Sequence, residues 1–196
     1  MPRRVGSFSA ALALVSHDPA ADHGSNASGQ ASVVLVDNQV RAFLFARGLS
    51  PNLPHAMHIH GHDEAVAECP SMARAGDDGL IDTVDGLPDY GPIQVSFTTR
   101  GATGGNLLPD GLDLSRFPVA DRFGLMSYQR TLTVPDDVAA RLGDMHIVIH
   151  GHDLNGNGTY DGQASSLSAL VGVPVPLEAE LPVACGPLNG FARTIG

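Results

Sequence analysis

Two stretches of the chain, MHIHGHD at residues 57–63 and HIVIHGHD at residues 146–153, end in the same pentapeptide, IHGHD, and decide how the fold is interpreted. Each stretch alternates like a β-strand up to a glycine, Gly61 or Gly151, which we expect to end the strand. Seven of the nine histidines lie in these copies or just before them. The repeat therefore predicts two strand ends that meet at one histidine-rich site.

Imidazole is the commonest metal ligand in proteins, so this site is predicted to hold a metal. Residues two apart in a strand share a face, which places His58 with His60 and His146 with His150. The expected ligands are His58, His60 and His150, completed by His146, His62 or His152. An all-imidazole site favours copper or zinc over magnesium or calcium, and the affinity order favours copper.

The alternative is that these histidines are core or rim residues hydrogen-bonded to the backbone. That interpretation suits a single histidine better than a duplicated cluster, so the metal hypothesis is preferred. His17 and His23 lie in a polar loop and are predicted to be surface residues.

The composition fits one β-rich domain over residues 1–196, with 23 glycines, 14 prolines and no tryptophan. The formal net charge is −10 and all 11 cationic residues are arginines, which argues against nucleic acid as a partner. No apolar stretch approaches the roughly 20 residues that span a membrane, so no membrane insertion is expected. The sequence leaves a homo-oligomer open.

The pattern predicts an all-β fold, a Greek-key β-sandwich or flattened barrel of about eight antiparallel strands. Strands are expected at residues 5–15, 30–36, 39–47, 55–61, 92–99, 126–134, 145–150, 168–175 and 177–185. Residues 62–91 are predicted to be irregular. One short helix is expected at 135–142, where proline opens the first turn and Gly143 follows the end. The first strand is preferred to a signal peptide cleaved after Ala13, so any export leader would be missing from this sequence.

Three segments resemble the copper–zinc superoxide dismutase family and its relatives that carry the chordin (CHRD) domain. They are GLSPNLPHAMHIHGHDEAVAEC at 48–69, VIHGHDLNGNG at 148–158 and LPVACGPLNG at 181–190. The resemblance implies a superoxide dismutase-like domain with copper on His58, His60 and His150, superoxide as a small inorganic substrate, and a secreted, extracellular or periplasmic location. It also implies a Cys69–Cys185 disulfide, which the even cysteine count by itself only permits.

The sequence departs from that family in two places. No histidine lies between Asp63 and Met145, where the resemblance would place the bridging and remaining zinc histidines, so the zinc subsite is expected to be absent. Pro182 stands where the family has a guiding arginine. The sequence therefore suggests a copper-only protein with low or no dismutase activity. The alternative is a non-catalytic secreted metal-binding or adhesion module of the CHRD type.

A second, weaker motif follows the later repeat. Oxygen donors at Asp153, Asn155, Asn157, Thr159 and Asp161 fit the first nine positions of a calcium loop, and Gly158 occupies the sharp turn. The twelfth position is Ala164, where a bidentate glutamate belongs. Calcium would therefore bind weakly, and the run is also compatible with an ordinary Asn-Gly turn.

Overall fold

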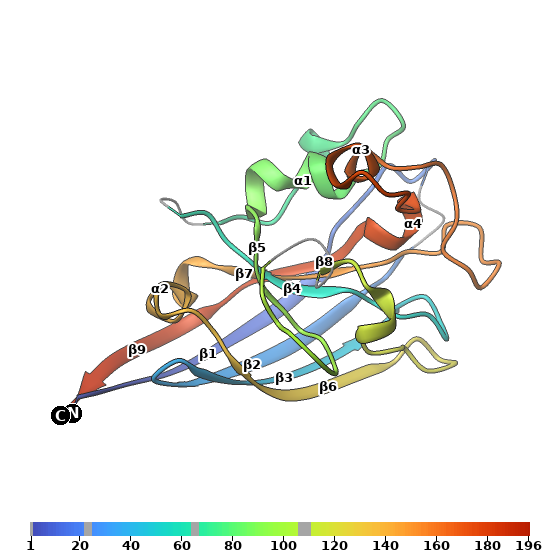
Figure 1. Cartoon of the computed structure of the whole chain (residues 1–196). Coiled ribbons are helices and arrows are strands. Elements are labelled where there is room, and N and C mark those ends of the chain that lie inside the picture. The colour runs from blue at the N-terminus through green and yellow to red at the C-terminus, as the bar shows by residue number, and fades with distance from the viewer. Residues whose placement is uncertain (1, 22–24, 64–66, 106–110) are drawn as a thin grey trace.

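The computed structural model describes residues 2–21, 25–63, 67–105 and 111–196, and shows a curled, mostly antiparallel sheet that folds over as a half-barrel (Figure 1). The strands are β1 Arg3–Leu14, β2 Ser28–Val36, β3 Gln39–Arg47, β4 Met57–His60, β5 Ile93–Ser96, β6 Met126–Thr133, β7 His146–His150, β8 Pro182–Pro187 and β9 Asn189–Ile195. The expected all-β Greek-key fold is confirmed.

The strand order is β5-β4-β7-β8-β1-β2-β3-β6, with β9 also paired to β1. The first part of β1 pairs with β9 and its last two residues, Ala13 and Leu14, pair with β8, so β1 is the seam between two halves. The chain crosses between the halves after β3, β5, β6 and β8. These crossings bring β4 and β7, distant in sequence, side by side in the second half.

The main core lies between the two halves of the sheet. Strand alternation builds it: Phe8, Ala10 and Leu12 of β1 are buried, and the intervening residues are exposed. Met57 and Ile59 of β4 enter the same core, together with isoleucines from β7. The histidines that alternate with these residues must therefore face away from the main core.

The structure contains more helix than the sequence predicted. The helices are α1 Thr83–Tyr90, α2 Asp136–Ala140, α3 Ser166–Val171 and α4 Leu177–Glu180. Helix α2 confirms the one expected helix. Helices α1, α3 and α4 gather on the outer side of the β4–β7–β8 half, away from β2, β3 and β6 (Figure 1).

Helix α1 contradicts the irregular segment predicted over 62–91. Its Asp82 side chain accepts hydrogen bonds from the backbone of Val84 and Asp85, in a reciprocal capping box. Pro88 inside the helix and a nearby glycine obscured it in the sequence, since both residues usually interrupt helices.

The strand predicted at 168–175 is also wrong, and the one predicted at 177–185 is right only in its second half. Helix α3 ends at Gly172, which has φ +73° and closes the helix in the left-handed conformation. Helix α4 occupies the beginning of the second segment, and β8 begins at Pro182. Short apolar runs cannot be assigned to helix or strand from periodicity alone, which explains both errors.

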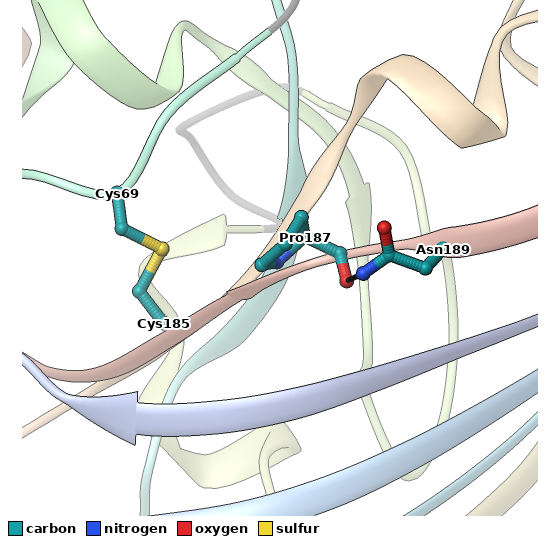
Figure 2. Close-up of a disulfide and its surroundings, with 4 residues drawn as sticks. All are labelled: Cys69, Cys185, Pro187 and Asn189. Atoms are coloured by element: carbon teal, nitrogen blue, oxygen red, sulfur yellow. Dashed lines mark hydrogen bonds between the residues drawn. A yellow bond between two sulfur atoms is a disulfide. The ribbon is translucent and has the colours of Figure 1, made fainter.

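A disulfide joins Cys69 to Cys185, as the family resemblance implied, with a Cα–Cα distance of 5.7 Å. Figure 2 shows Cys69 on the segment between β4 and α1, reaching down to β8. Further along the chain, where β8 ends and β9 begins, the Asn189 side chain donates to the Pro187 carbonyl at 3.1 Å. The disulfide thus fixes the segment that follows the first histidine repeat to the sheet.

Within the described ranges, the structure contains no helix that is both long and apolar enough to cross a membrane.

Candidate metal centre

The two histidine repeats lie on neighbouring antiparallel strands. In the β4–β7 register His58 is opposite Val148, and His60 is opposite His146. Both strands stop at the histidine before the glycine of the repeat, as predicted. The histidines project from the outer face of this half of the sheet, where Val148 packs with Tyr90 of α1 in a second, smaller hydrophobic cluster.

Three of these histidines form one compact group. The ligand nitrogens of His58, His60 and His150 lie within 4.8 Å of one another, and the three rings are 5.3–5.6 Å apart between centroids. The three residues are 2, 1 and 3% exposed, so the group is shielded from solvent. The sequence prediction that these three side chains converge is therefore correct in the structure.

One nitrogen of each ring is held by a backbone carbonyl. His58 Nε2 donates to Gly111 at 3.1 Å, His60 Nδ1 to Gly91 at 2.8 Å, and His150 Nδ1 to Glu180 at 2.7 Å. A carbonyl oxygen can only accept, so each of these nitrogens must carry the proton. The tautomer of every ring is thereby fixed, and the opposite nitrogen keeps its lone pair.

Among the described residues, His58 Nδ1, His60 Nε2 and His150 Nε2 are buried and unpartnered. A buried polar atom without a partner is costly, and such atoms are uncommon in folded proteins. Three of them in one group, each with its lone pair available, are the ligand set that a transition-metal ion requires.

The rings are neutral in the folded protein. Burial, together with the neighbouring rings of His150 and His146, lowers the pKa of His60 to about 3, and burial lowers that of His150 to about 4. Burial, together with His150 and His60, also lowers the pKa of His58 well below 6.5. Metal ions compete with protons for imidazole nitrogens, so neutral rings favour metal binding at physiological pH.

The other candidate ligands lie outside this group. His62 Nε2 faces the carbonyls of Pro88 and Asp89 at 3.1 Å, and the His152 amide donates to Glu178. His146 is buried beside His60, with an unpartnered Nδ1 and a pKa lowered to about 4 by burial. None of these three joins the close group in the described part of the chain.

Two further histidines, His55 and His17, are buried and contact backbone groups. His55 is fully buried, and its two ring nitrogens lie 3.0 and 3.1 Å from the carbonyls of His150 and Ser50, so it connects the first repeat to the second. His17 was predicted to be at the surface, but it is 3% exposed: Nε2 donates to Pro182 and Nδ1 accepts from the Ile81 amide. The polar residues around His17 in the sequence indicated a surface loop, and no local pattern indicated these backbone partners. His23 lies outside the described residues.

A cavity of about 150 Å³ adjoins the histidine group. The three histidines, Thr83 and Glu180 supply its polar lining, and apolar side chains line the rest. Glu180 is 3% exposed, and burial raises the pKa of its carboxyl to about 7. Polar groups of Ser165 and Thr83 lie near the carboxyl and offset part of that rise, but neither has the geometry of a hydrogen bond to it. Sequence reasoning missed Glu180, because no pattern connects a glutamate near the C-terminus to the repeats.

The predicted calcium loop is closed by its own hydrogen bonds. Asp153 accepts from the amides of Asn157 and Gly158 at 3.1 and 2.8 Å, and Asp161 accepts from the Asn155 and Asn157 side chains. Glu178 accepts from the amides of Leu154 and Asp161, and so fastens the loop to α4. The loop therefore has a defined shape, and whether it binds calcium stays a prediction.

No known family model matches the chain, and no curated protein matches it in sequence.

Proposed function

We propose that the protein binds one copper ion through His58, His60 and His150. The observation that carries this proposal is the set of three buried, unpartnered nitrogens in one group, each on a ring whose other nitrogen donates to a carbonyl. An all-imidazole set also accommodates zinc, and the affinity order favours copper over zinc.

The backbone carbonyls would tune the site as well as orient it. Each donated N–H fixes a ring and raises the basicity of the opposite nitrogen, which strengthens its bond to a metal. Gly91 and Gly111 lie in segments that cover the sheet, and Glu180 closes helix α4. Each of the three ligand rings is thus held by a segment outside the sheet. The metal centre would therefore form only when these segments are packed against the sheet.

Weak superoxide dismutation is the activity we infer for this centre. A bound copper ion would supply one-electron chemistry, in which one superoxide is oxidised to oxygen and a second, with two protons, is reduced to hydrogen peroxide. The resemblance of the three segments to the dismutase family supports this inference. No arginine lines the described cavity, however, and the net charge of −10 opposes the approach of an anion.

A non-catalytic metal-binding module is the second candidate function. The buried carboxyl of Glu180, in the cavity next to the histidines, favours it, because a carboxylate there would repel superoxide. Pro182 stands where the dismutase family has an arginine that guides superoxide, which also favours the non-catalytic module. For either function we propose a location outside the cytosol, with which the Cys69–Cys185 disulfide is compatible.

Metal analysis combined with a superoxide-decay assay separates these functions. We expect one copper per chain after loading and dialysis, and a rate constant far below the diffusional range of roughly 10⁸–10⁹ M⁻¹s⁻¹. The His58→Ala/His60→Ala variant should lose the copper, whereas the matched His62→Ala/His152→Ala variant should retain it. A copper-loaded wild-type protein whose dismutase activity does not exceed that of the His58→Ala/His60→Ala variant would favour the binding module. Retention of copper by that variant would contradict the proposed site.

A further inference from the structure

The cavity beside the histidine group is built mostly from apolar side chains. Ala56 and Ile93 come from the sheet region, Leu112 and Leu114 from the segment after residue 110, and residues 173–176 from the connection between α3 and α4. Val173 is 43% exposed, so this part of the cavity wall lies at the surface. A volume of about 150 Å³ matters because an engineered apolar cavity of about that size in another protein binds benzene.

Glu180 distinguishes this cavity from a simple apolar one. Both of its carboxyl oxygens are buried and, among the described residues, neither has a hydrogen-bond partner. Among the described residues that line the cavity there is no lysine or arginine to neutralise a carboxylate. A buried carboxyl without a partner is strongly unfavourable, and a ligand that donates a hydrogen bond to it would remove that cost.

We propose that this cavity binds a neutral or cationic compound with a single six-membered ring and an O–H or N–H donor, of which phenol is the simplest. The apolar wall would bury the ring, and the donor would point to the Glu180 carboxyl. Carboxylate-bearing rings should be excluded, because a second negative charge would face Glu180 in a poorly solvated space. The inference needs no metal, so it does not depend on the proposed copper site.

Fluorine NMR on the metal-free protein tests this binding with three probes: 4-fluorophenol, fluorobenzene and 4-fluorobenzoate. We expect 4-fluorophenol to bind most tightly, fluorobenzene more weakly, and 4-fluorobenzoate not at all. Glu180→Leu should weaken 4-fluorophenol binding by about tenfold, the loss expected for a hydrogen bond to a charged group, and leave fluorobenzene bound. The same change at the exposed Glu68 is the control and should alter neither affinity.

A second variant keeps the test decisive if Glu180→Leu does not fold. Val173→Trp alters a partly exposed wall residue and should block the cavity, so that all probes lose binding while the thermal midpoint is maintained. The proposal is overturned if no probe binds the wild-type protein, if Val173→Trp leaves binding intact, or if phenol and benzene derivatives bind equally well to wild type. The last result would mean that water, rather than a ligand donor, satisfies Glu180.

Discussion

His60 donates from Nδ1 to the carbonyl oxygen of Gly91, 2.8 Å away, and this bond joins the first repeat to the residue that ends α1. Gly91 has φ +76°, and a Cβ there would lie 2.6 Å from the carbonyl carbon of Gly61. The glycine therefore permits both the positive φ and the close approach that positions its carbonyl.

Gly91→Ala should destabilise the protein and weaken copper binding together. The backbone conformation alone costs about 1–3 kcal/mol for a residue with a Cβ, and the clash with Gly61 adds to it. Gly156→Ala is the matched control, because Gly156 has φ +69° but no atom within 4 Å of an added Cβ. Urea unfolding and copper titration measure both effects. Equal stability losses and unchanged copper affinity in the two variants would show that the Gly91 contact does not hold His60.

The metal-free protein should lose stability in acid because of its neutral histidines. The folded pKa of His60 is about 3 and that of His150 about 4, whereas an unfolded histidine titrates near 6.5. As pH falls below about 6.5 the unfolded chain takes up protons that the folded rings do not, so the free energy of unfolding decreases until the folded pKa is reached. Each unit of difference corresponds to roughly 1.4 kcal/mol at most.

Urea unfolding at a series of pH values between 7 and 4 measures this dependence. His150→Asn removes one titrating ring, so its stability should fall less steeply with acid than that of the wild type. Carboxylates contribute to both proteins and cancel in the comparison. An identical pH dependence in the two proteins would contradict a neutral, buried His150.

Removing the disulfide should cost a large part of the stability. The bond closes a separation of 116 residues, for which the chain-entropy model gives about 4–5 kcal/mol. The Cys69→Ser/Cys185→Ser variant should also bind copper more weakly, because the covering segment that continues to α1 and Gly91 would no longer be fixed to β8. Denaturant unfolding of the variant beside the oxidised protein measures the loss. A change below about 1 kcal/mol would mean that packing alone holds the segment.

Sequence alternation was sufficient to predict β1 to β7 and the histidine triad, because residues two apart in a strand share a face whatever the rest of the fold does. It placed a strand over α3, found β8 only in part and missed β9. Met57 and Ile59 in the core, opposite His58 and His60, follow directly from that rule. The helices and loops that cover the β4–β7–β8 half could not be predicted in the same way. Glu180 reaches the cavity through a tertiary contact, and no local pattern encodes such a contact.

Calcium should raise the thermal midpoint only if Asp153, Asn155, Asn157 and Asp161 turn their oxygens to a shared ion. The loop already has a closed shape through its own hydrogen bonds, and Ala164 removes a strong ligand, so affinity should be at the millimolar end, on the order of 10⁻⁴–10⁻³ M. Thermal unfolding with several millimolar calcium, on wild type and Asp153→Ala, is the measurement. An equal effect of calcium on both proteins would leave the loop as an ordinary turn.

The central claim is that three histidines with fixed tautomers bind one copper ion, and electron paramagnetic resonance of the Cu(II)-loaded protein tests it most directly. The spectrum of the wild-type protein should display coupling to three imidazole nitrogens at one copper per chain. That pattern should lose one nitrogen in each of the variants His58→Ala, His60→Ala and His150→Ala, and stay unchanged in His62→Ala. Loss of nitrogen coupling in His62→Ala, or an unaltered spectrum in all three ligand variants, would contradict the assignment.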